Sequence, residues 1–303
     1  MKVFMTGSNG FVGSNLIRHF HNQGHHVTAL VRDKARAKGF PPEVSVVTGR
    51  SIEPGTWQEA VPGHDLLINL AGASIFKRWN AEYKQLLRDS RLLTTRNLVH
   101  AIPEGAAVTL LSTSAVGYYG FTGDEELDEE SPAGRDFLAV LARDWENAAF
   151  EAREKGVRVV ATRYGVVLGD DGGALDQMIM PFRFLMGGPL GSGRQWFSWI
   201  HIRDLCHAAL FVASTPDIQG PVNFTAPVPV RNRDLAAAIG KALNRPSFMP
   251  APSFMIRLVL GEFGDVILKG QRVVPRVLQQ HGFSFDFPRI EDALGNLLKG
   301  RHT

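Results

Sequence analysis

A glycine-rich turn near the start of the chain has the spacing of phosphate-binding turns. Gly7, Gly10 and Gly13 follow a short apolar run and open a segment with helical spacing of large apolar residues. Gly7 permits a tight turn, Gly10 lets backbone amides approach a pyrophosphate, and Gly13 lets the helix lie close to the strand. The amino terminus of that helix favours an anion. We therefore expect dinucleotide binding through Gly7, Ser8, Asn9, Gly10, Phe11, Val12 and Gly13.

The residues after the second apolar run indicate which dinucleotide binds. A carboxylate at this point would bind both ribose hydroxyls of NAD, whereas a basic residue would pair with the extra 2′-phosphate of NADP. Val31 ends the run and Arg32 follows it, with Lys34 and Arg36 close behind. A guanidinium can hold a phosphate through two parallel hydrogen bonds, so we expect NADP(H). The alternative is a solvated loop in which Asp33 binds the ribose of NAD.

These residues need strands and helices to position them, and the hydrophobic pattern predicts both. Apolar runs alternate with long helical patterns, of which Ala81–His100 and Phe137–Lys155 are the longest. Strands that are apolar on both faces belong to a parallel sheet covered by helices on each side. The sequence thus predicts an α/β fold, a Rossmann-type doubly wound parallel sheet. The expected strands are Lys2–Thr6, His26–Val31, Val44–Thr48, Asp65–Leu70, Ala107–Ser112 and Val157–Arg163.

Beyond Gly169 the chain becomes rich in glycine and proline, which is typical of a lid or substrate region rather than of more sheet. A helix over Ile202–Ser214 and a strand near Val222–Thr225 are expected to return to the main sheet. We expect an NADP-binding domain over 1–168, with return elements at about 200–226, and a smaller, mostly helical substrate region over 169–199 and 227–303. The expected helix breaks in that region are Pro246, Pro252, Gly264, Pro275 and Pro288.

Composition excludes several classes of protein. The 303 residues are 44% apolar and 21% charged with a net charge of +3, which argues against disorder and does not indicate nucleic-acid binding. The single cysteine, Cys206, cannot form an intrachain disulfide and is interpreted as core. The first residues lack the apolar stretch of a secretory signal, and no apolar run is long enough to span a membrane. We therefore expect a cytoplasmic protein without nucleic-acid or membrane partners.

Three other features of the sequence do not indicate a metal, a partner or a catalytic role. Four histidines near residues 19–26 lack companions at ligand spacing, so we expect no metal. The segment Asp124–Glu130 holds six acids in seven residues and is predicted to be a solvated loop without a partner. His201 is expected to pack or to cap the following helix rather than act as an acid or base.

Several motifs together resemble the extended, sugar-nucleotide epimerase-like form of the short-chain dehydrogenase/reductase superfamily. The Thr6–Gly13 turn matches that group, as do Asn69–Gly72 after the fourth strand and Ser112–Ala115 after the fifth. Within the group, the chain resembles the atypical epimerase family proteins of YfcH-like type, including their C-terminal helical domain. The segments that carry this closer resemblance are Trp79–Asn80, Ser90–Arg91, Gly117–Gly120, Arg163–Gly169, Gly187–Arg194, Trp199–Ile202, Gly261–Glu262 and Leu268–Pro275.

The resemblance implies a cofactor site assembled from several loops. The glycines would hold the pyrophosphate and Arg32 the adenosine phosphate, while Arg91 would reach the cofactor phosphates from the long helix. The loop after Arg163 would border the nicotinamide. The implied cofactor residues beyond the first turn are Val31, Arg32, Leu70, Ala71, Gly72, Arg91, Ser112, Arg163 and Gly165. A homodimer formed through the two long helices is also implied.

One part of the family pattern is missing. Superfamily members that do redox chemistry pair a serine or threonine with Tyr-x-x-x-Lys, in which the lysine lowers the pKa of the tyrosine. Leu138 and Ala142 stand at about those two positions in this chain. The usual proton relay is therefore absent. The catalytic candidates that remain near the expected nicotinamide are Ser114, Tyr118 and Tyr119.

Arg194 follows a glycine-rich loop and, by the same resemblance, would pair with a substrate diphosphate; the alternative is an interdomain salt link. Arg163 or Arg194 could also lower the pKa of a nearby tyrosine. We expect an NADP(H)-dependent oxidoreductase or epimerase-like enzyme for a small polar substrate, with nucleotide-linked compounds included. The alternative is a protein that holds NADP(H) as a sensor or structural ligand without turnover, which the missing Tyr-x-x-x-Lys favours.

Overall fold

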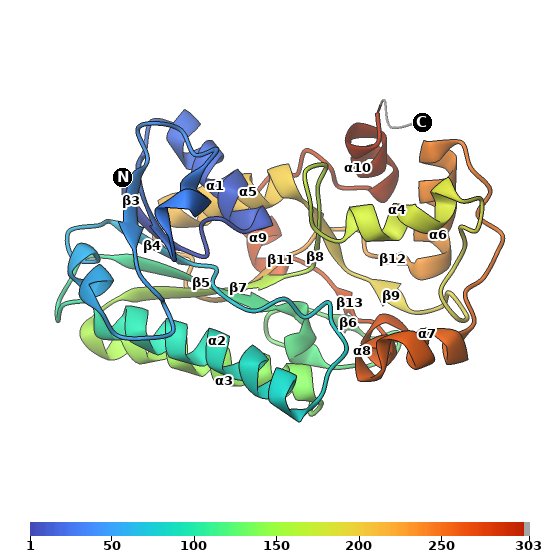
Figure 1. The fold of residues 1–303 in the computed structure, drawn as a ribbon, viewed down its shortest axis with the longest axis horizontal. Helices are drawn as coiled ribbons and strands as arrows, with labels where there is room; N and C mark the ends of the chain where they lie inside the picture. The colour runs from blue at the N-terminus through green and yellow to red at the C-terminus, as the bar shows by residue number, and fades with distance from the viewer. Residues whose placement is uncertain (300–303) are drawn as a thin grey trace.

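The structure is a computed structural model in which residues 1–299 are described, and its centre is a seven-stranded sheet (Figure 1). The strands lie in the order β11-β7-β5-β4-β1-β2-β3, and every neighbouring pair is parallel. The strands are β1 (Lys2–Thr6), β2 (His26–Val31), β3 (Ser45–Thr48), β4 (Leu66–Asn69), β5 (Thr109–Ala115), β7 (Arg158–Tyr164) and β11 (Gly220–Phe224). The predicted Rossmann-type fold is confirmed.

Helices cover both faces of the sheet, with α1 and α5 on one face and α2 and α3 on the other (Figure 1). Side chains of β1 alternate between two cores, because Val3 and Met5 belong to the core beneath α1 and α5, whereas Phe4 packs with Leu98 of α2. A strand covered on both faces has to be apolar on both. These elements are α1 (Phe11–Asn22), α2 (Ala81–His100), α3 (Phe137–Phe150), α5 (Ile202–Ser214), and the 3-10 helices η1 (Lys34–Ala37), η2 (Thr56–Ala60), η3 (Val116–Tyr119) and η4 (Glu151–Lys155).

The strand order makes β1 the expected position of a ligand site. The neighbours of β1 are β2 on one side and β4 on the other, so the chain reverses its direction across the sheet at this point. In open α/β sheets, ligands bind outside the carboxyl ends of the strands at such a switch point. A ligand at this point would meet the β1–α1 turn, the end of β2 and the loop after β4.

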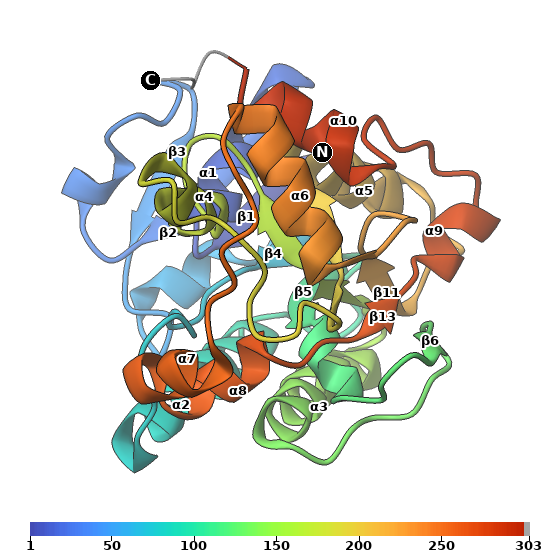
Figure 2. The same cartoon turned by 90° about the vertical axis from the view of Figure 1, so that its right-hand side faces the viewer.

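A second, mainly helical region lies beside the sheet, where β7 leads into β8 (Figure 1). Its core includes Ile179, Trp199, Leu235 and Leu294. In Figure 2, α6 and α10 lie on one side of this region, and α8 lies beside α2, where Glu262 pairs with Lys84. The helices are α4 (Leu175–Arg183), α6 (Asn232–Leu243), α7 (Ser253–Leu260), α8 (Glu262–Ile267), α9 (Arg276–Gln280) and α10 (Ile290–Leu297). Three two-stranded pairs complete it: β8 (Val166–Leu168) with β10 (Trp199–His201), β9 (Trp196–Phe197) with β12 (Val230–Arg231), and β6 (Glu126–Leu127) with β13 (Arg272–Val273).

Most expected elements form where the sequence places them, with local differences. The bounds of α2 and α5 agree with the prediction, but β5 continues to Ala115, so that Ser114 lies within the strand. The helix break expected at Gly264 is wrong, because Gly264 lies inside α8 and Gly261, with φ of 60°, separates α7 from α8. Residues 300–303 of the predicted C-terminal region lie outside the described residues. Within residues 1–299, no helix is both long and apolar enough to cross a bilayer.

Candidate functional site

The β1–α1 turn has the shape expected of a phosphate-binding turn. Gly7 has φ of 67°, and a Cβ built on it would lie 2.7 Å from the carbonyl carbon of Leu70. A Cβ on Gly13 would lie 2.4 Å from the carbonyl oxygen of Gly7, so that no side chain fits there without moving backbone. Helix α1 follows Gly10 with no side-chain cap on its first amides. These amides and the helix dipole together favour an anion.

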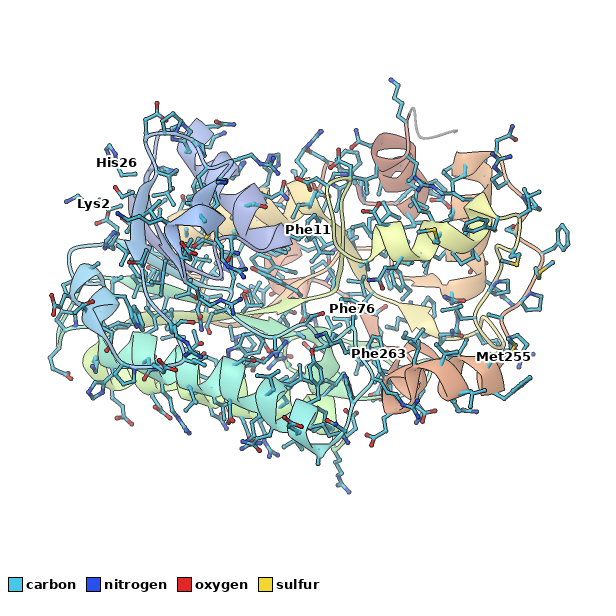
Figure 3. The ribbon with its side chains drawn as sticks, viewed as in Figure 1. Lys2, Phe11, His26, Phe76, Met255 and Phe263 are labelled. Carbon is cyan, nitrogen blue, oxygen red and sulfur yellow. The ribbon has the colours of Figure 1, made fainter. Side chains whose placement is uncertain are left out.

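The other side chains of the turn hold it in place. The Ser8 hydroxyl donates to the Met5 carbonyl at 2.7 Å and is buried. The Phe11 ring fills the space beside Gly169, where a Cβ would lie 2.5 Å from Cζ (Figure 3). Val12 packs against the core beneath α1, and Asn9 is exposed. Ser8 and Phe11 would therefore meet a cofactor through their backbone rather than their side chains.

Two residues after β2 are candidates for binding the adenosine part of the cofactor, Asp33 at the ribose hydroxyls and Arg32 at a 2′-phosphate. Asp33 Oδ1 accepts a hydrogen bond from the Ala35 amide at 3.0 Å and thereby caps η1. Arg32 is exposed, directly after buried Val31. A carboxylate used as a helix cap is less available to ribose hydroxyls, whereas the guanidinium remains available to a phosphate.

Arg91 lies against the loop that follows β4. Its Nη1 donates to the Leu87 carbonyl at 3.0 Å and its Nη2 to the Ala73 carbonyl at 3.1 Å. Its Cζ lies 5.1 Å from the centre of the Trp145 ring, and a Cβ on Gly72 would lie 3.2 Å from Cζ. Burial lowers the pKa of Arg91 to about 10, which leaves it charged at neutral pH. Arg91 therefore lies against the Gly72–Ala73 segment, and its predicted contact with the cofactor phosphates stays a prediction.

A buried ion pair lies at the end of β5. Arg163 Nε and Nη2 donate to the two carboxylate oxygens of Glu146 at 2.7 and 2.8 Å. The Ser114 hydroxyl donates to Glu146 Oε1 at 2.6 Å. All three residues are nearly inaccessible, with exposed fractions of 2% for Ser114 and Arg163 and 4% for Glu146. Since the Arg163 guanidinium is occupied by internal partners, this geometry does not support its predicted direct contact with the cofactor.

Tyr119 extends this network, and Tyr118 lies on it. Arg163 Nη1 donates to the Tyr119 hydroxyl at 2.9 Å, and that hydroxyl donates to Asn223 Oδ1 at 2.7 Å. Arg163 lowers the pKa of Tyr119, as expected, but burial raises it by more, so the net shift is upward. The half-buried Tyr118 ring lies 3.5 Å from Arg163 Cζ. Burial also raises the pKa of Tyr164, to about 12.

Two further expected cofactor residues contribute to packing between strands. Ser112 is buried and accepts a long hydrogen bond from Asn69 Nδ2 at 3.4 Å. Gly165, just before β8, allows the close approach of β8 and β10, because a Cβ on it would lie 2.9 Å from the Ser198 carbonyl oxygen. Their contact with a cofactor stays a prediction.

Helix α3 carries no proton relay at the expected positions. Leu138 lies against η3, where a Cβ on Gly117 would be 3.4 Å from the Leu138 Cβ. Ala142 is buried and belongs to the face of α3 that meets the rest of the molecule. Neither residue can donate or accept a proton.

The acidic segment Asp124–Glu130 is not the freely solvated loop that was predicted, because the rest of the chain pairs with it. Its ion pairs are Asp124 with Arg231, Glu126 with Arg272, and Asp128 and Glu130 with Arg276. Glu129 is buried, and its Oε1 accepts from the amides of Asn223 at 2.9 Å and Val277 at 3.2 Å. The segment is anchored by residues that follow it by about a hundred positions or more, which no local charge pattern shows.

Arg194 lines a basic cleft of about 570 Å³. The cations in its lining are Arg194, Arg231, Arg233 and Lys269, against the single carboxylate of Asp124; Phe121 and Trp196 are its aromatic residues. Arg231 lies 3.9 Å from the centre of the Trp196 ring and pairs with Asp124 at 2.6 Å. The remaining positive charge favours an anionic ligand. The alternative interpretation assigned a salt link to Arg194. In this cleft the salt link is formed by Arg231 instead.

His201 is a cap, as the sequence indicates. Its Nδ1 accepts from the Arg203 amide at 3.0 Å, which assigns the ring proton to Nε2, beside Asn296 Oδ1 at 3.2 Å. The ring stacks on Phe287 with 3.9 Å between centroids, and burial lowers its pKa to about 4. His201 is therefore a neutral, packed residue at neutral pH.

Sequence comparison identifies the family. A family model described as the NAD dependent epimerase/dehydratase family matches residues 3–224, and one described as domain of unknown function DUF1731 matches residues 251–297. The chain belongs to the NAD-dependent epimerase/dehydratase family.

Within this epimerase/dehydratase family, three relatives illustrate the similarity. The chain is 40% identical over 303 residues to the chloroplastic epimerase family protein SDR39U1 homolog of Arabidopsis thaliana, covering 99% of this chain and 87% of that one. It is 41% identical over 295 residues to epimerase family protein Mb2239 of Mycobacterium bovis, covering 97% and 96%. The solved structure of human epimerase family protein SDR39U1 with NADPH has a TM-score of 0.87 at 33% identity, covering 99% of this chain and 100% of that chain. The resemblance stated from the motifs is confirmed.

Several residues of the site in this epimerase/dehydratase family member had no predicted role. Glu146 joins Ser114 to Arg163, and its signal was a lone acid on an otherwise apolar helix face. Arg233 and Lys269 join Arg194 in the basic cleft from distant parts of the chain. No local motif marks them.

Within residues 1–299, one cluster consists of residue types that bind metal ions. Ligand atoms of Asp204, His207 and Asp286 lie within 4.8 Å of one another. The two oxygens of Asp204 already accept from the amides of Asp286 at 2.8 Å and Phe287 at 3.0 Å, which explains a buried carboxylate there. The absence of a metal stays a prediction.

Proposed function

We propose that this epimerase/dehydratase family member binds NADP(H) beside β1 and acts on a small, anionic, polar substrate as an oxidoreductase or epimerase-like enzyme. The observation that carries the proposal is the β1–α1 turn, where Gly7 and Gly13 leave no room for a side chain and the α1 amides have no side-chain cap. The exposed Arg32 beside the capping Asp33 supports the 2′-phosphorylated form. The NADPH in the solved human relative supports the same choice.

The cofactor residues fit a dinucleotide by their chemistry. The amides of the β1–α1 turn would hold the pyrophosphate, and Arg32 would hold the 2′-phosphate. The backbone of Leu70 and Ala71, which lies against Gly7, would border the ribose. When bound, the nicotinamide supplies or accepts a hydride.

Ser114 is the group we assign to the substrate oxygen. Because its hydroxyl donates to Glu146, its lone pairs remain free to accept a hydrogen bond from a substrate hydroxyl. Tyr118 is the proton-donor candidate, since its ring is only half-buried whereas Tyr119 is enclosed and hydrogen-bonded to Asn223.

The basic cleft is the part of the molecule that we assign to the anionic group of the substrate. Phe121 and Asp124 line it and follow Tyr119 by two and five residues, so the chain runs from the candidate catalytic tyrosines into the lining of the cleft. Arg231 already lies over the Trp196 ring, which makes an aromatic platform for a base less available there. Phosphate, diphosphate or carboxylate groups suit the guanidinium groups that line the cleft, and nucleotide-linked compounds qualify through their diphosphate.

A second candidate function is a sensor or structural protein that holds NADP(H) without turnover. The observation that favours it is the pair Leu138 and Ala142 on α3, where the superfamily pattern has its tyrosine and lysine. Both candidate functions use the same cofactor site. They differ in whether a hydride is transferred to or from the nicotinamide.

The test mixes the purified protein and NADPH with a panel of carbonyl compounds and nucleotide sugars and follows absorbance of the reduced nicotinamide. Sustained oxidation that Ser114→Ala abolishes while NADPH still binds supports the enzyme. Arg194→Met should raise the KM of an anionic substrate, whereas the exposed Arg183→Met on α4 should not. Tight NADPH binding without oxidation across the panel would favour the sensor.

The cytoplasmic location, the lack of nucleic-acid and membrane partners, and the homodimer remain proposals from the sequence. Sedimentation of the purified protein across a concentration series tests the dimer, which a single monomeric species at all concentrations would contradict.

A further inference from the structure

The strand order separates the two halves of a dinucleotide bound at β1. Arg32 follows β2, so the adenosine half would extend toward β2. Strands β4 and β5 lie on the other side of β1, so the nicotinamide half would extend over them. The loop that follows β4 and begins with Leu70–Ala73 therefore borders the nicotinamide half.

Arg91 is the cation that α2 brings to this loop. Its two hydrogen-bond partners, the Leu87 and Ala73 carbonyls, are neutral, and a guanidinium has five donors. Arg88 and Arg96 on the same helix pair with Asp144 and Glu151, but within residues 1–299 no carboxylate lies within ion-pair distance of Arg91. Partial burial of a charge without a counter-charge is unfavourable, and an anionic or hydroxyl-rich ligand would offset that cost.

The guanidinium is held in position before any ligand binds. Gly72 packs beneath it, where a Cβ would lie 3.2 Å from Cζ. The loop itself is fixed by Phe76, whose ring meets the Phe263 ring of α8 at 5.6 Å (Figure 3), and by the Tyr83 hydroxyl, which donates to the Ser74 carbonyl. Such preorganisation reduces the entropy lost when a ligand binds.

Arg91 also lies over the part of α3 that lacks the superfamily lysine. Its Cζ is 5.1 Å from the Trp145 ring, and Trp145 follows Ala142 by three residues. Residues three apart on a helix are neighbours on one face. The charge that α3 lacks at Ala142 is thus available from α2.

We propose that Arg91 positions the nicotinamide half of the cofactor and supplies there, from α2, the cation that the superfamily pattern places on α3. The inference rests on the proposed function, because it requires NADP(H) to bind beside β1. It differs from a general phosphate contact, which would act on the pyrophosphate and therefore on both halves of the cofactor.

Calorimetric binding of two ligands to the full chain tests this role. NADPH has both halves, whereas adenosine 2′,5′-bisphosphate keeps the 2′-phosphate and the first phosphate of the bridge but lacks the nicotinamide half. We expect Arg91→Met to weaken NADPH binding about tenfold or more and to leave bisphosphate binding within about twofold of wild type. Arg88→Met, which removes an α2–α3 ion pair one turn away, is the matched control and should change neither affinity.

Each other outcome has a defined meaning. Equal weakening of both ligands by Arg91→Met would overturn the proposal in favour of a pyrophosphate contact. Unchanged affinities would overturn it in favour of a link between α2 and the loop after β4. If Arg91→Met does not fold, Gly72→Ala, which presses on the guanidinium without removing it, must show the same selective loss, and its absence would overturn the proposal. A wild-type chain that binds neither ligand would contradict the proposed function itself.

Discussion

The Ser114 hydroxyl and the Glu146 carboxylate form a buried 2.6 Å hydrogen bond between β5 and α3. Glu146 is fixed in turn by two hydrogen bonds from Arg163 on β7. The orientation of the serine is therefore set by an internal ion pair rather than by a neighbouring tyrosine. This arrangement leaves Ser114 as an acceptor toward a substrate hydroxyl.

Breaking the Glu146–Arg163 pair should destabilise the fold strongly. Glu146→Gln keeps the shape but leaves the buried Arg163 charge without its counter-charge, which costs about 3–5 kcal/mol in comparable cases. Urea unfolding measures this loss. Glu151→Gln, which removes a half-exposed partner of Arg96, is the control and should cost about 1 kcal/mol or less. Equal losses in the two variants would show that the buried pair is not the stabilising element that we describe.

The close approach at Gly13 should be essential for cofactor binding. Gly13→Ala places a Cβ 2.4 Å from the Gly7 carbonyl oxygen and must push α1 away from the turn, so NADPH affinity should fall by about tenfold or more. Gly295→Ala in α10, where a Cβ meets open space, should leave NADPH binding unchanged and stabilise its helix by about 0.5–1 kcal/mol. Calorimetry with NADPH compares the two, and an unaffected Gly13→Ala would count against the turn as the pyrophosphate site.

The cofactor side of the site could be predicted because its signals are local. Gly7, Gly13 and Arg32 lie next to strand ends, where residue type and position together imply a role. The Ser114–Glu146 bond joins residues 32 positions apart, and the Tyr119–Asn223 bond joins residues 104 positions apart. Their pairing depends on how α3 and β11 pack against β5 and β7, which a single sequence does not show.

Tyr119 shows the same limit in its electrostatics. The sequence suggested that a nearby arginine would lower the pKa of a tyrosine, and Arg163 does contact Tyr119. Burial outweighs that contact and raises the pKa of Tyr119. The depth at which η3 is buried decides whether the pKa of Tyr119 rises or falls. That depth cannot be predicted from sequence spacing.

Acid should destabilise the protein through the buried His201 and the half-buried His19. Burial lowers the pKa of His201 and of His19 from 6.5 to about 4. Between these pH values the unfolded chain binds more protons than the folded one, so stability falls as pH decreases from 6.5 toward 4. The double variant His19→Gln/His201→Gln should show a shallower decrease in urea unfolding across this range. A slope equal to that of wild type would mean that other groups govern the acid transition.

The most direct test of the account is calorimetric titration of the wild-type chain and Arg32→Asp with NADPH and with NADH at low ionic strength. Because a guanidinium–phosphate contact contributes about 1.5–3 kcal/mol, wild type should bind NADPH at least about tenfold more tightly than NADH, and Arg32→Asp should lose that preference. Binding of neither nucleotide, or equal affinity of wild type for both, would contradict the assignment of the β1–α1 turn and Arg32 to NADP(H).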